Sequence, residues 1–256
     1  MALAYQTALT IESVIKDIDS KKYLLPSIQR EFVWSTGQIE KLFDSLMRDY
    51  PINAFLFWKV PREKVSEFKF YEFLRDYHQK DNKHNPKANT NGTEDIIAIL
   101  DGQQRMTSLY IALKGTYAYK MSYKRWDNPA AYPKRKLYLN LLAASDDADM
   151  FYDFLFLTEE EAKNIKNDND EYEGSFWFPV GKILDFREES DVNDYLIDND
   201  LNTVADKAQA KFANKALFKL YSVIHNKQTI SYYLEESTEL DKVLNIFIRV
   251  NSGGTT

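Results

Sequence analysis

The chain has 256 residues, 44% of them hydrophobic and 14% aromatic, which is enough to bury a sizeable core. The absence of cysteine excludes disulfides, thiolate metal sites and a catalytic thiol. A net charge of −6 argues against a surface that follows nucleic acid everywhere, because neutralising phosphates requires clustered Lys and Arg. The N-terminus has no basic leader and no apolar run approaches about 18 residues, so we expect a cytoplasmic globular protein.

The first clear elements are a helix and a strand. Ser35 and Gln38 have the spacing of a capping box, and the apolar residues after them recur every 3.6 residues, which predicts a helix from about Thr36. The apolar and aromatic run from Ala54 to Val60 predicts a strand that is buried on both sides.

A polar loop and a strand–turn–helix unit follow. Residues 77–94 are rich in Asn and almost free of apolar side chains, which predicts a mobile surface loop between two strands. Residues 96–100 have the composition of an interior strand, and residues 106–113 have the period of a helix with one buried face. The string Asp101-Gly102-Gln103-Gln104-Arg105 therefore lies on a strand-to-helix turn.

The second half is predicted to be mainly helical. Residues 144–202 are acidic with aromatic clusters, which we interpret as short helices and loops that cover one side of the core. A helix is expected over residues 204–225 and a strand over residues 230–234. A capped helix is expected from about residue 238, with the apolar residues 240, 243, 244, 247 and 248 on one face.

One segment, residues 120–136, interleaves basic and aromatic side chains. Such a mixture can hold phosphates and stack bases. The alternative is a solvated surface around a helix end, where long basic side chains cover apolar atoms. The residues concerned are Lys120, Lys124, Arg125, Lys134, Arg135 and Lys136, together with Tyr119, Tyr123, Trp126, Tyr132 and Tyr138.

The Asp101–Arg105 turn combines the residue types of a phosphate site. A helix N-terminus has unpaired backbone N–H groups and a partial positive charge, and Gly102 lets the backbone approach a ligand closely. Arg105 could fork onto a phosphate, Gln103 and Gln104 could orient a water or a base edge, and Asp101 could hold a metal ion or accept a proton. In the alternative interpretation Asp101 caps the helix and Arg105 pairs with it.

Two further polar clusters flank helices. Residues 26–34 contain Gln29 and Arg30 beside aromatic side chains, suited to a phosphate or an everted base, although Arg30 could also pair with Glu31 on the surface. Residues 249–254 offer Arg249 and Asn251, a pattern that is also typical of an ordinary helix end and turn.

Together these clusters carry a family resemblance. The matching blocks are Pro26-x-x-Gln29-Arg30-x-Phe32-Val33-Trp34, Asp44-Ser45-Leu46, Tyr50-Pro51-Ile52, Leu100-Asp101-Gly102-Gln103-Gln104-Arg105-Met106-Thr107-Ser108-Leu109 and Phe247-Ile248-Arg249-Val250-Asn251-Ser252-Gly253-Gly254-Thr255. From about residue 20 to the last residue, the chain resembles the N-terminal family of GmrSD restriction endonucleases, also called the domain of unknown function 262 family. The departures inside the motifs are Met106, where Leu is usual, and Ser108, where Thr is common.

The resemblance implies an α+β fold: a ParB/sulfiredoxin-like core of a small mixed sheet with packed helices and helical insertions, forming a single domain over residues 1–256. It also implies binding and hydrolysis of an NTP, either GTP or ATP, with a divalent metal such as Mg²⁺, in antiphage systems that recognise modified DNA. No Gly-x-x-x-x-Gly-Lys-Ser/Thr pattern occurs, so the hydrolysis would not be of the P-loop kind.

The resemblance assigns roles by position. Asp101, Gln103, Gln104 and Arg105 would be catalytic, with Asp101 also the metal ligand. The nucleotide and its phosphates would be held by Gln29, Arg30, Gly102, Thr107, Arg249 and Asn251.

Family members often continue into a His-Asn-His nuclease domain. The histidines here are His78, His84 and His225, in no nuclease arrangement, so we expect no DNA cleavage by this chain and a nuclease domain or subunit located elsewhere. The other expected partner is modified DNA, homo-oligomers are allowed, and a membrane is not expected. The alternatives are a non-catalytic sensor of modified DNA, to which the 120–136 segment would contribute, and a folded but inert domain.

Overall fold

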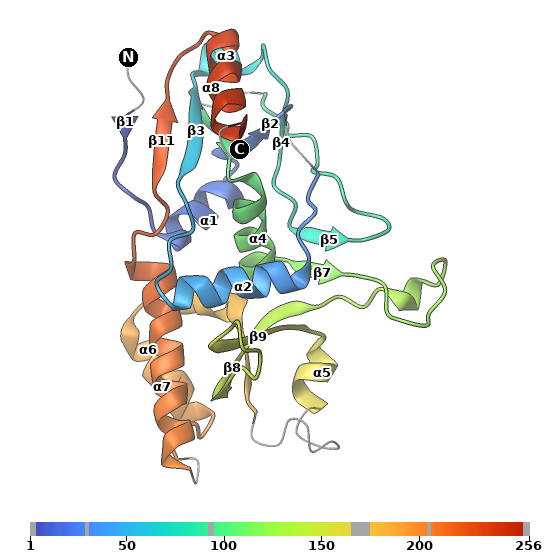
Figure 1. The fold of residues 1–256 in the computed structure, drawn as a ribbon, viewed down its shortest axis with the longest axis vertical. Coiled ribbons are helices and arrows are strands. Elements are labelled where there is room, and N and C mark those ends of the chain that lie inside the picture. Colours follow the sequence, from blue (N-terminus) through green and yellow to red (C-terminus); the bar gives the residue numbers. More distant parts are fainter. Residues whose placement is uncertain (1–3, 29–30, 92–94, 165–174, 204–205, 253–256) are drawn as a thin grey trace.

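The computed structural model describes residues 4–28, 31–91, 95–164, 175–203 and 206–252, and it has an α+β fold built on a mixed sheet (Figure 1). The main sheet has six strands in the order β1-β11-β3-β6-β2-β4. Strands β11 and β3 are parallel, as are β2 and β6, whereas β3 and β6 are antiparallel. The strands are β1 (Ala4–Tyr5), β11 (Tyr232–Glu235), β3 (Phe55–Val60), β6 (Ile96–Asp101), β2 (Tyr23–Pro26) and β4 (Phe70–Tyr71).

Two smaller sheets complete the strand inventory of the described residues. One is antiparallel, in the order β10-β8-β9, and the other is a parallel pair of β5 and β7. Their bounds are β10 (Trp177–Pro179), β8 (Lys136–Ala144), β9 (Tyr152–Leu157), β5 (Asp76–His78) and β7 (Thr116–Ala118). The helices are α1 (Ile11–Asp19), α2 (Thr36–Met47), α3 (Arg62–Val65), α4 (Gln103–Lys114), α5 (Glu159–Asn164), α6 (Glu189–Asp198), α7 (Lys207–Tyr221) and α8 (Leu240–Ser252), with short helical turns at Pro129–Ala131, Val180–Asp185 and Ser222–Asn226.

The central strands β3 and β6 bury both of their faces, as their composition predicts. Because side chains alternate across a strand, Ile99 of β6 joins the large core on one face while Ala98 and Leu100 join a smaller core on the other. The large core continues through α1, α2 and α4 to the β10-β8-β9 sheet. The smaller core contains Trp58 of β3 and is completed by Val243 of α8.

Helix α2 begins where its sequence predicts. Ser35 is the N-cap residue, and the reciprocal hydrogen bonds of a capping box join it to Gln38. Helix α4 also occurs as expected, but the prediction of a single buried face is wrong, since every residue from Met106 to Leu113 is buried. Because α1, α2, β8 and the helical turn Val180–Asp185 all contact it, α4 is the central helix of the fold.

The prediction for residues 144–202 missed a sheet. Helices α5 and α6 are present, but the segment also contains β9 and β10, which pair with β8. These strands are short and carry mixed polar and aromatic side chains, so no period of two stood out. Their inward side chains, among them Phe154 and Phe178, are fully buried in the large core.

Two further loop predictions need correction. The 77–94 segment includes the end of β5, and Asn85 and Ala88 are buried within it, so it is not wholly a surface loop. The 120–136 segment does not flank an α-helix: it leaves β7, projects from the body of the protein, contains the short helical turn Pro129–Ala131 and returns as β8 (Figure 1).

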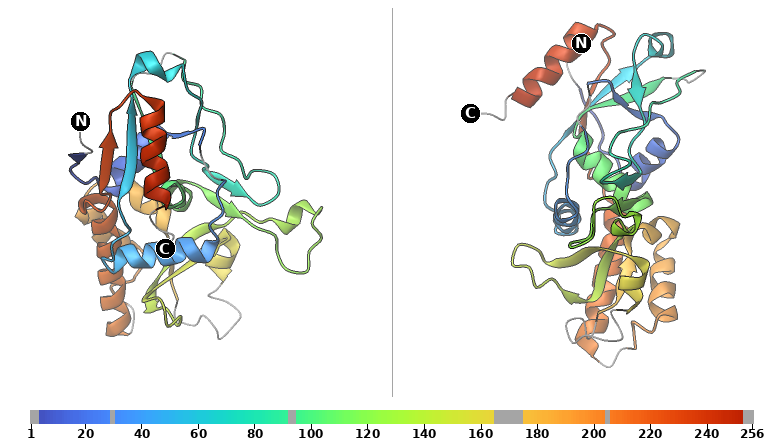
Figure 2. Two further views of the ribbon diagram at one scale, coloured as in Figure 1. Left: turned by 45° about the horizontal axis from the view of Figure 1, so that its top comes forward. Right: turned by 90° about the vertical axis from the view of Figure 1, so that its right-hand side faces the viewer.

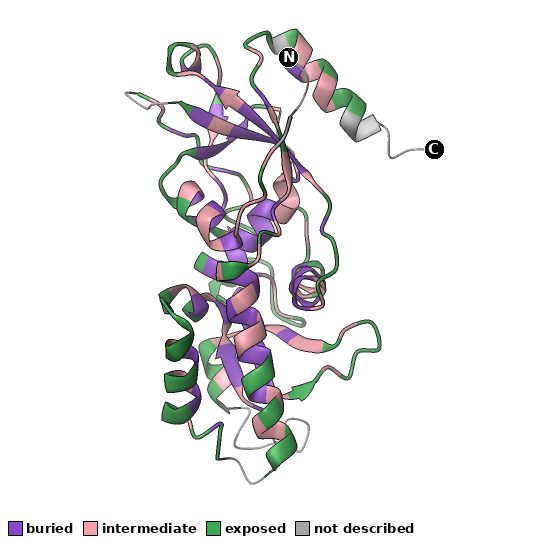
Figure 3. Cartoon of the chain, turned by 90° about the vertical axis from the view of Figure 1, so that its left-hand side faces the viewer, coloured by how far each residue is buried: buried purple, intermediate pink, exposed green. Residues whose placement is uncertain are grey.

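The last helix, α8, lies against the face of the main sheet opposite α1 and α4 (Figure 2). Its apolar side chains were expected to pack as one face, but among those that the structure describes only Val243 is fully buried, Leu244 and Phe247 are half-buried, and Ile248 is 58% exposed. Figure 3 shows that most of α8 is half-buried or exposed. None of the helices in the described part of the chain has the length and apolar composition needed to cross a membrane.

Candidate functional site

A cleft of about 240 Å³ lies where β6 ends and α4 begins. Its wall consists of Trp34, the residues from Leu100 to Arg105, and Phe247 of α8. These residues come from the three polar blocks that lie far apart in the sequence. The structure therefore gathers part of each block around one hollow.

Gly102 makes the strand-to-helix turn possible. Its φ is +86°, in the left-handed region that glycine adopts without strain. A Cβ atom at this position would lie 2.2 Å from the Phe55 ring, far inside van der Waals contact, and 3.2 Å from Nη2 of Arg105. The residue is thus required both for the backbone conformation and for the close approach of Phe55.

The N-terminus of α4 opens at this cleft without a capping side chain. Gly102 occupies the N-cap position, and no side chain of the described residues accepts a hydrogen bond there. The N–H groups of the first turn have no partner within the helix, and the helix dipole adds partial positive charge. The expectation that Asp101 caps this end is therefore not met, although its pairing with Arg105 is, at 3.6 Å between Oδ2 and Nη2.

Arg105 holds a neighbouring segment in place. Its guanidinium donates to the carbonyl oxygens of Ile52, Asn53 (2.9 Å) and Ala54 (3.2 Å), and its Cζ lies 4.4 Å from the centre of the Phe55 ring. Asn53 is in the left-handed region, with φ of +63°, within the segment whose three carbonyls meet one guanidinium. Burial lowers the pKa of Arg105, while the charge of Asp101 opposes that change.

Gln103 and Gln104 also bind backbone. The Nε2 atom of Gln103 donates to the carbonyl of Ile99 at 2.9 Å, which closes the turn on itself. Gln104 donates to the carbonyl of Glu31 at 2.9 Å and accepts from the N–H of Val33 at 3.0 Å. This two-point amide contact fixes the segment that brings Trp34 to the cleft. Three of the four polar side chains at the turn thus have a structural task.

Asp101 is the carboxylate at the cleft wall. Its side chain is about one-third exposed. The described residues contain no group of three or more His, Asp or Glu side chains that could enclose a metal ion. A single carboxylate still fits Mg²⁺, because this ion is often held by one or two carboxylates together with the phosphates of a nucleotide.

The other predicted binding residues are more scattered. Thr107 is 3% exposed inside α4, and Arg249 is exposed on α8; neither belongs to the cleft wall. Gln29, Arg30 and the side chain of Asn251 lie outside the described residues. Sequence reasoning did not single out Trp34 and Phe247 as site residues, although both stand within the family blocks, each next to a polar cluster.

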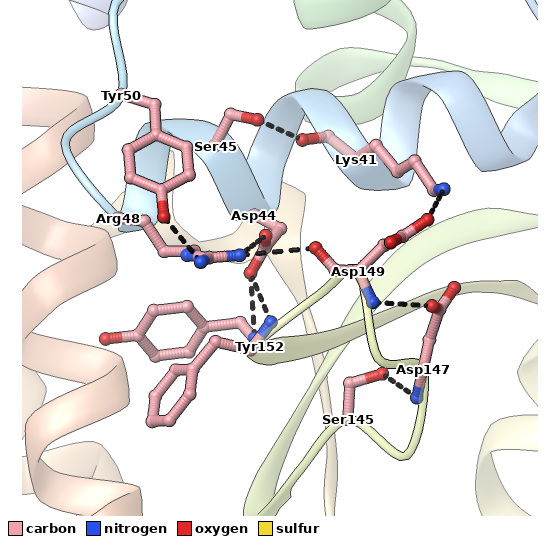
Figure 4. A network of polar contacts seen from close by, with 10 residues as sticks. Lys41, Asp44, Ser45, Arg48, Tyr50, Ser145, Asp147, Asp149 and Tyr152 are labelled. Atoms are coloured by element: carbon pink, nitrogen blue, oxygen red, sulfur yellow. Dashed lines mark hydrogen bonds and ion pairs between the residues drawn. The ribbon is translucent and has the colours of Figure 1, made fainter.

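A second polar network lies away from the cleft, around Asp44 of α2 (Figure 4). Asp44 is 3% exposed, and its Oδ1 accepts from the N–H groups of Phe151 (2.9 Å) and Tyr152 (2.8 Å). Oδ2 accepts from Arg48 at 3.3 Å, and Arg48 also donates to the carbonyl of Asp149 at 3.2 Å. Both carboxylate oxygens are therefore used in docking the β8–β9 loop onto α2.

Glu40 makes the next contact along the same junction. It accepts from the N–H of Phe156 in β9 at 3.1 Å. Burial raises the pKa of Glu40 to about 7; the hydrogen bond from Phe156 opposes the rise and the charge of Asp153 adds to it. The α2–β9 junction, defined by Glu40, Asp44 and Arg48 of α2 with their partners in the β8–β9 loop and in β9, thus docks α2 onto the β10-β8-β9 sheet.

Comparison with known proteins agrees with the blocks around the cleft. The "Uncharacterized protein MJ0686" of Methanocaldococcus jannaschii is 33% identical over 113 residues, which make up 44% of this chain and 18% of that protein. The chain thus spans a small part of the length of that curated relative. The family model "GmrSD restriction endonuclease, N-terminal domain" matches residues 11–256. The chain therefore belongs to the family of GmrSD restriction endonuclease N-terminal domains, which is the family of a restriction-system component.

Proposed function

We propose that the cleft at the start of α4 binds a nucleoside triphosphate and that the domain hydrolyses it to regulate a restriction system. The observation that carries this proposal is the N-terminus of α4 at the cleft, which begins after Gly102 and has no capping side chain among the described residues. Unpaired N–H groups and the helix dipole favour a phosphate, and the absence of a side chain at Gly102 lets a phosphate oxygen approach the backbone.

The aromatic walls support a nucleotide rather than a simple anion. Trp34 and Phe247 line the cleft together with the turn, and both are partly exposed. An exposed aromatic face can stack on a base, an interaction that tolerates any base. The proposed site would therefore combine a phosphate-binding element with aromatic stacking surfaces in one hollow.

The proposed roles follow from what each side chain already contacts. Asp101 is the residue we assign to Mg²⁺ and to the attacking water, because its carboxylate is at the cleft wall and partly exposed. Arg105 and Gln104 are positioning residues, since their hydrogen bonds fix residues 52–54 and 31–33. Removing either would move a wall of the site rather than only delete a charge.

The wider role is proposed from the family. A GmrSD-type system acts on modified DNA, so we propose modified DNA and a nuclease domain or subunit as partners, with a ParB/sulfiredoxin-like arrangement of the nucleotide pocket. Nucleotide turnover in this domain would then regulate that nuclease domain or subunit.

The test is phosphate release from GTP, ATP and CTP with Mg²⁺, with and without modified DNA. Asp101→Asn keeps the shape of the side chain and removes its charge, so we expect nucleotide binding to persist and turnover to fall by at least about 100-fold. Arg105→Ala should weaken nucleotide binding and also lower the rate of turnover. If the wild-type chain shows no turnover but still binds modified DNA, the NTPase proposal is refuted and the domain is instead a non-catalytic sensor of modified DNA.

A further inference from the structure

Residues 119–136 form an arm, here called the basic arm, that projects beside the turn after β5, residues 79–87. Figures 1 and 2 show both segments leaving the same edge of the protein, and the parallel pairing of β5 with β7 places them side by side. The N–H of Gln79 donates to Ala118 at 2.9 Å, and the N–H of Lys120 donates to the side chain of Gln79 at 2.8 Å. The two segments are therefore tied together at their base.

The charge of this surface is opposite to that of the whole chain. The two segments contain nine Lys and Arg residues and two acidic residues, Asp81 and Asp127, in a chain of net charge −6. Most of the basic side chains are exposed, including Lys124, Arg125 and Lys134. A local concentration of cations on an acidic protein is suited to a polyanion, because it attracts phosphates to one face only.

The tip of the arm presents aromatic rings to solvent. Tyr123 is fully exposed (105%) and has a left-handed backbone, with φ of +63°. Trp126 is 51% exposed. Exposed rings that flank Lys124 and Arg125 match the pattern of surfaces that stack the bases of a nucleic acid while holding its phosphate backbone.

The arm is ordered by its own contacts before any ligand arrives. The hydroxyl of Tyr132 donates to the carbonyl of Trp126 at 2.9 Å, and the Tyr132 ring lies 4.8 Å from that of His78. Lys120 donates through its ammonium to the carbonyl of Lys124 at 2.8 Å. These bonds fix the tip, so that binding would not have to order it.

We propose that the basic arm binds single-stranded nucleic acid, with Trp126 and Tyr123 stacking on unpaired bases and Lys124 and Arg125 contacting phosphates. A duplex offers its phosphates but keeps its bases stacked inside, so the exposed rings favour a strand with unpaired bases. This binding surface is separate from the nucleotide cleft, and the inference does not depend on the proposed NTPase function.

The experiment is fluorescence anisotropy of a labelled DNA strand of about 20 nucleotides, alone or annealed to its complement. We expect tighter binding of the single strand. The double variant Lys124→Glu/Arg125→Glu should weaken it at least about ten-fold and lower the slope of log K against log salt by about 1.4. The matched control Lys211→Glu/Lys215→Glu reverses two exposed lysines of α7 and should leave binding unchanged.

Variants of Trp126 test the contribution of base stacking to single-strand binding. Trp126→Ala should weaken single-strand binding at least about five-fold, whereas Trp126→Phe should largely restore it. Equal binding by the wild type and the arm double variant, or tighter binding of the duplex by the wild type, would overturn the proposal. A wild-type chain that binds the strand through the arm but binds no nucleoside triphosphate would refute the proposed function alone.

Discussion

The Asp101–Arg105 turn and the α2–β9 junction both place acidic and basic side chains inside the protein. They differ in how many of their hydrogen-bonding groups are used by protein partners. At the junction, both oxygens of Asp44 accept hydrogen bonds from protein groups. At the turn, Arg105 and Gln104 are likewise engaged, yet among the described residues no side chain caps the N–H groups that begin α4, and the residues of this turn line a cleft. Within one motif, some polar side chains can therefore stabilise the fold while the neighbouring backbone N–H groups remain available to a ligand.

The largest effect is expected from Asp44→Ala. The change leaves the N–H groups of Phe151 and Tyr152 and the Arg48 guanidinium without their buried partner, so the free energy of unfolding should fall by about 3–5 kcal/mol. Nucleotide affinity of the folded fraction should not change. Urea denaturation measures the first quantity and calorimetry the second. Lys41→Ala, which removes an exposed ion pair beside the same loop, is the control and should not alter stability.

Gly102→Ala should lower both the stability of the protein and its affinity for a nucleotide. The left-handed backbone and the contact with Phe55 should lower the free energy of unfolding by about 2 kcal/mol or more, and nucleotide affinity should fall with it. Gly37→Ala is a matched control, because a Cβ there meets only Glu40 Oε2 at 3.9 Å within a helix. That control should be neutral or stabilising by up to about 1 kcal/mol. A tolerated alanine at position 102 would refute the steric account of the turn.

Glu40→Gln tests the α2–β9 junction through the pH dependence of the free energy of unfolding. The pKa of Glu40 in the folded protein, about 7, lies above its ordinary value of 4.5, so the charged form destabilises the fold as pH rises through this range. Gln keeps the acceptor for the Phe156 N–H and carries no charge. The variant should be more stable than the wild type by about 3 kcal/mol at pH 8, and the difference should vanish below about pH 4.5. A difference that does not depend on pH would contradict this account.

The smallest effect is expected from Trp34→Ala. The side chain lines the cleft and is partly exposed, so its loss should cost little stability. Nucleotide affinity should fall about five-fold, which corresponds to about 1 kcal/mol of lost stacking. Trp177 is buried in the second sheet, and its replacement by Ala should instead lower stability. Unchanged nucleotide affinity in Trp34→Ala would show that the Trp34 ring does not contribute to nucleotide binding.

Sequence periodicity predicted the parts of the fold that are locally encoded. Helix α2 follows from its capping box, and β3, β6 and the start of α4 follow from apolar runs on either side of Gly102. Strands β8, β9 and β10 were harder to predict, because their burial depends on pairing with one another and on contact with α2 and α7. Long-range pairing of this kind leaves a weak local signal.

The candidate site was predicted in part for the same reason. The residue types at the turn indicated a phosphate site, and the cleft lies there. The sequence could not show that Arg105 bonds to three carbonyls, since that arrangement requires the left-handed conformation of Asn53 and the close approach of Phe55. Nor could it show that Phe247, more than 140 positions after Asp101 in the chain, lines the same hollow.

The most direct test of the central claim is equilibrium binding of GTP, ATP and CTP in the presence of Mg²⁺, measured by calorimetry on the wild type, Gly102→Ala and Gly37→Ala. We predict that at least one triphosphate binds the wild type, that Gly102→Ala weakens it by at least about ten-fold, and that Gly37→Ala leaves it unchanged. Absence of binding by the wild type, or equal affinity in all three proteins, would contradict the claim that the N-terminus of α4 holds the phosphates.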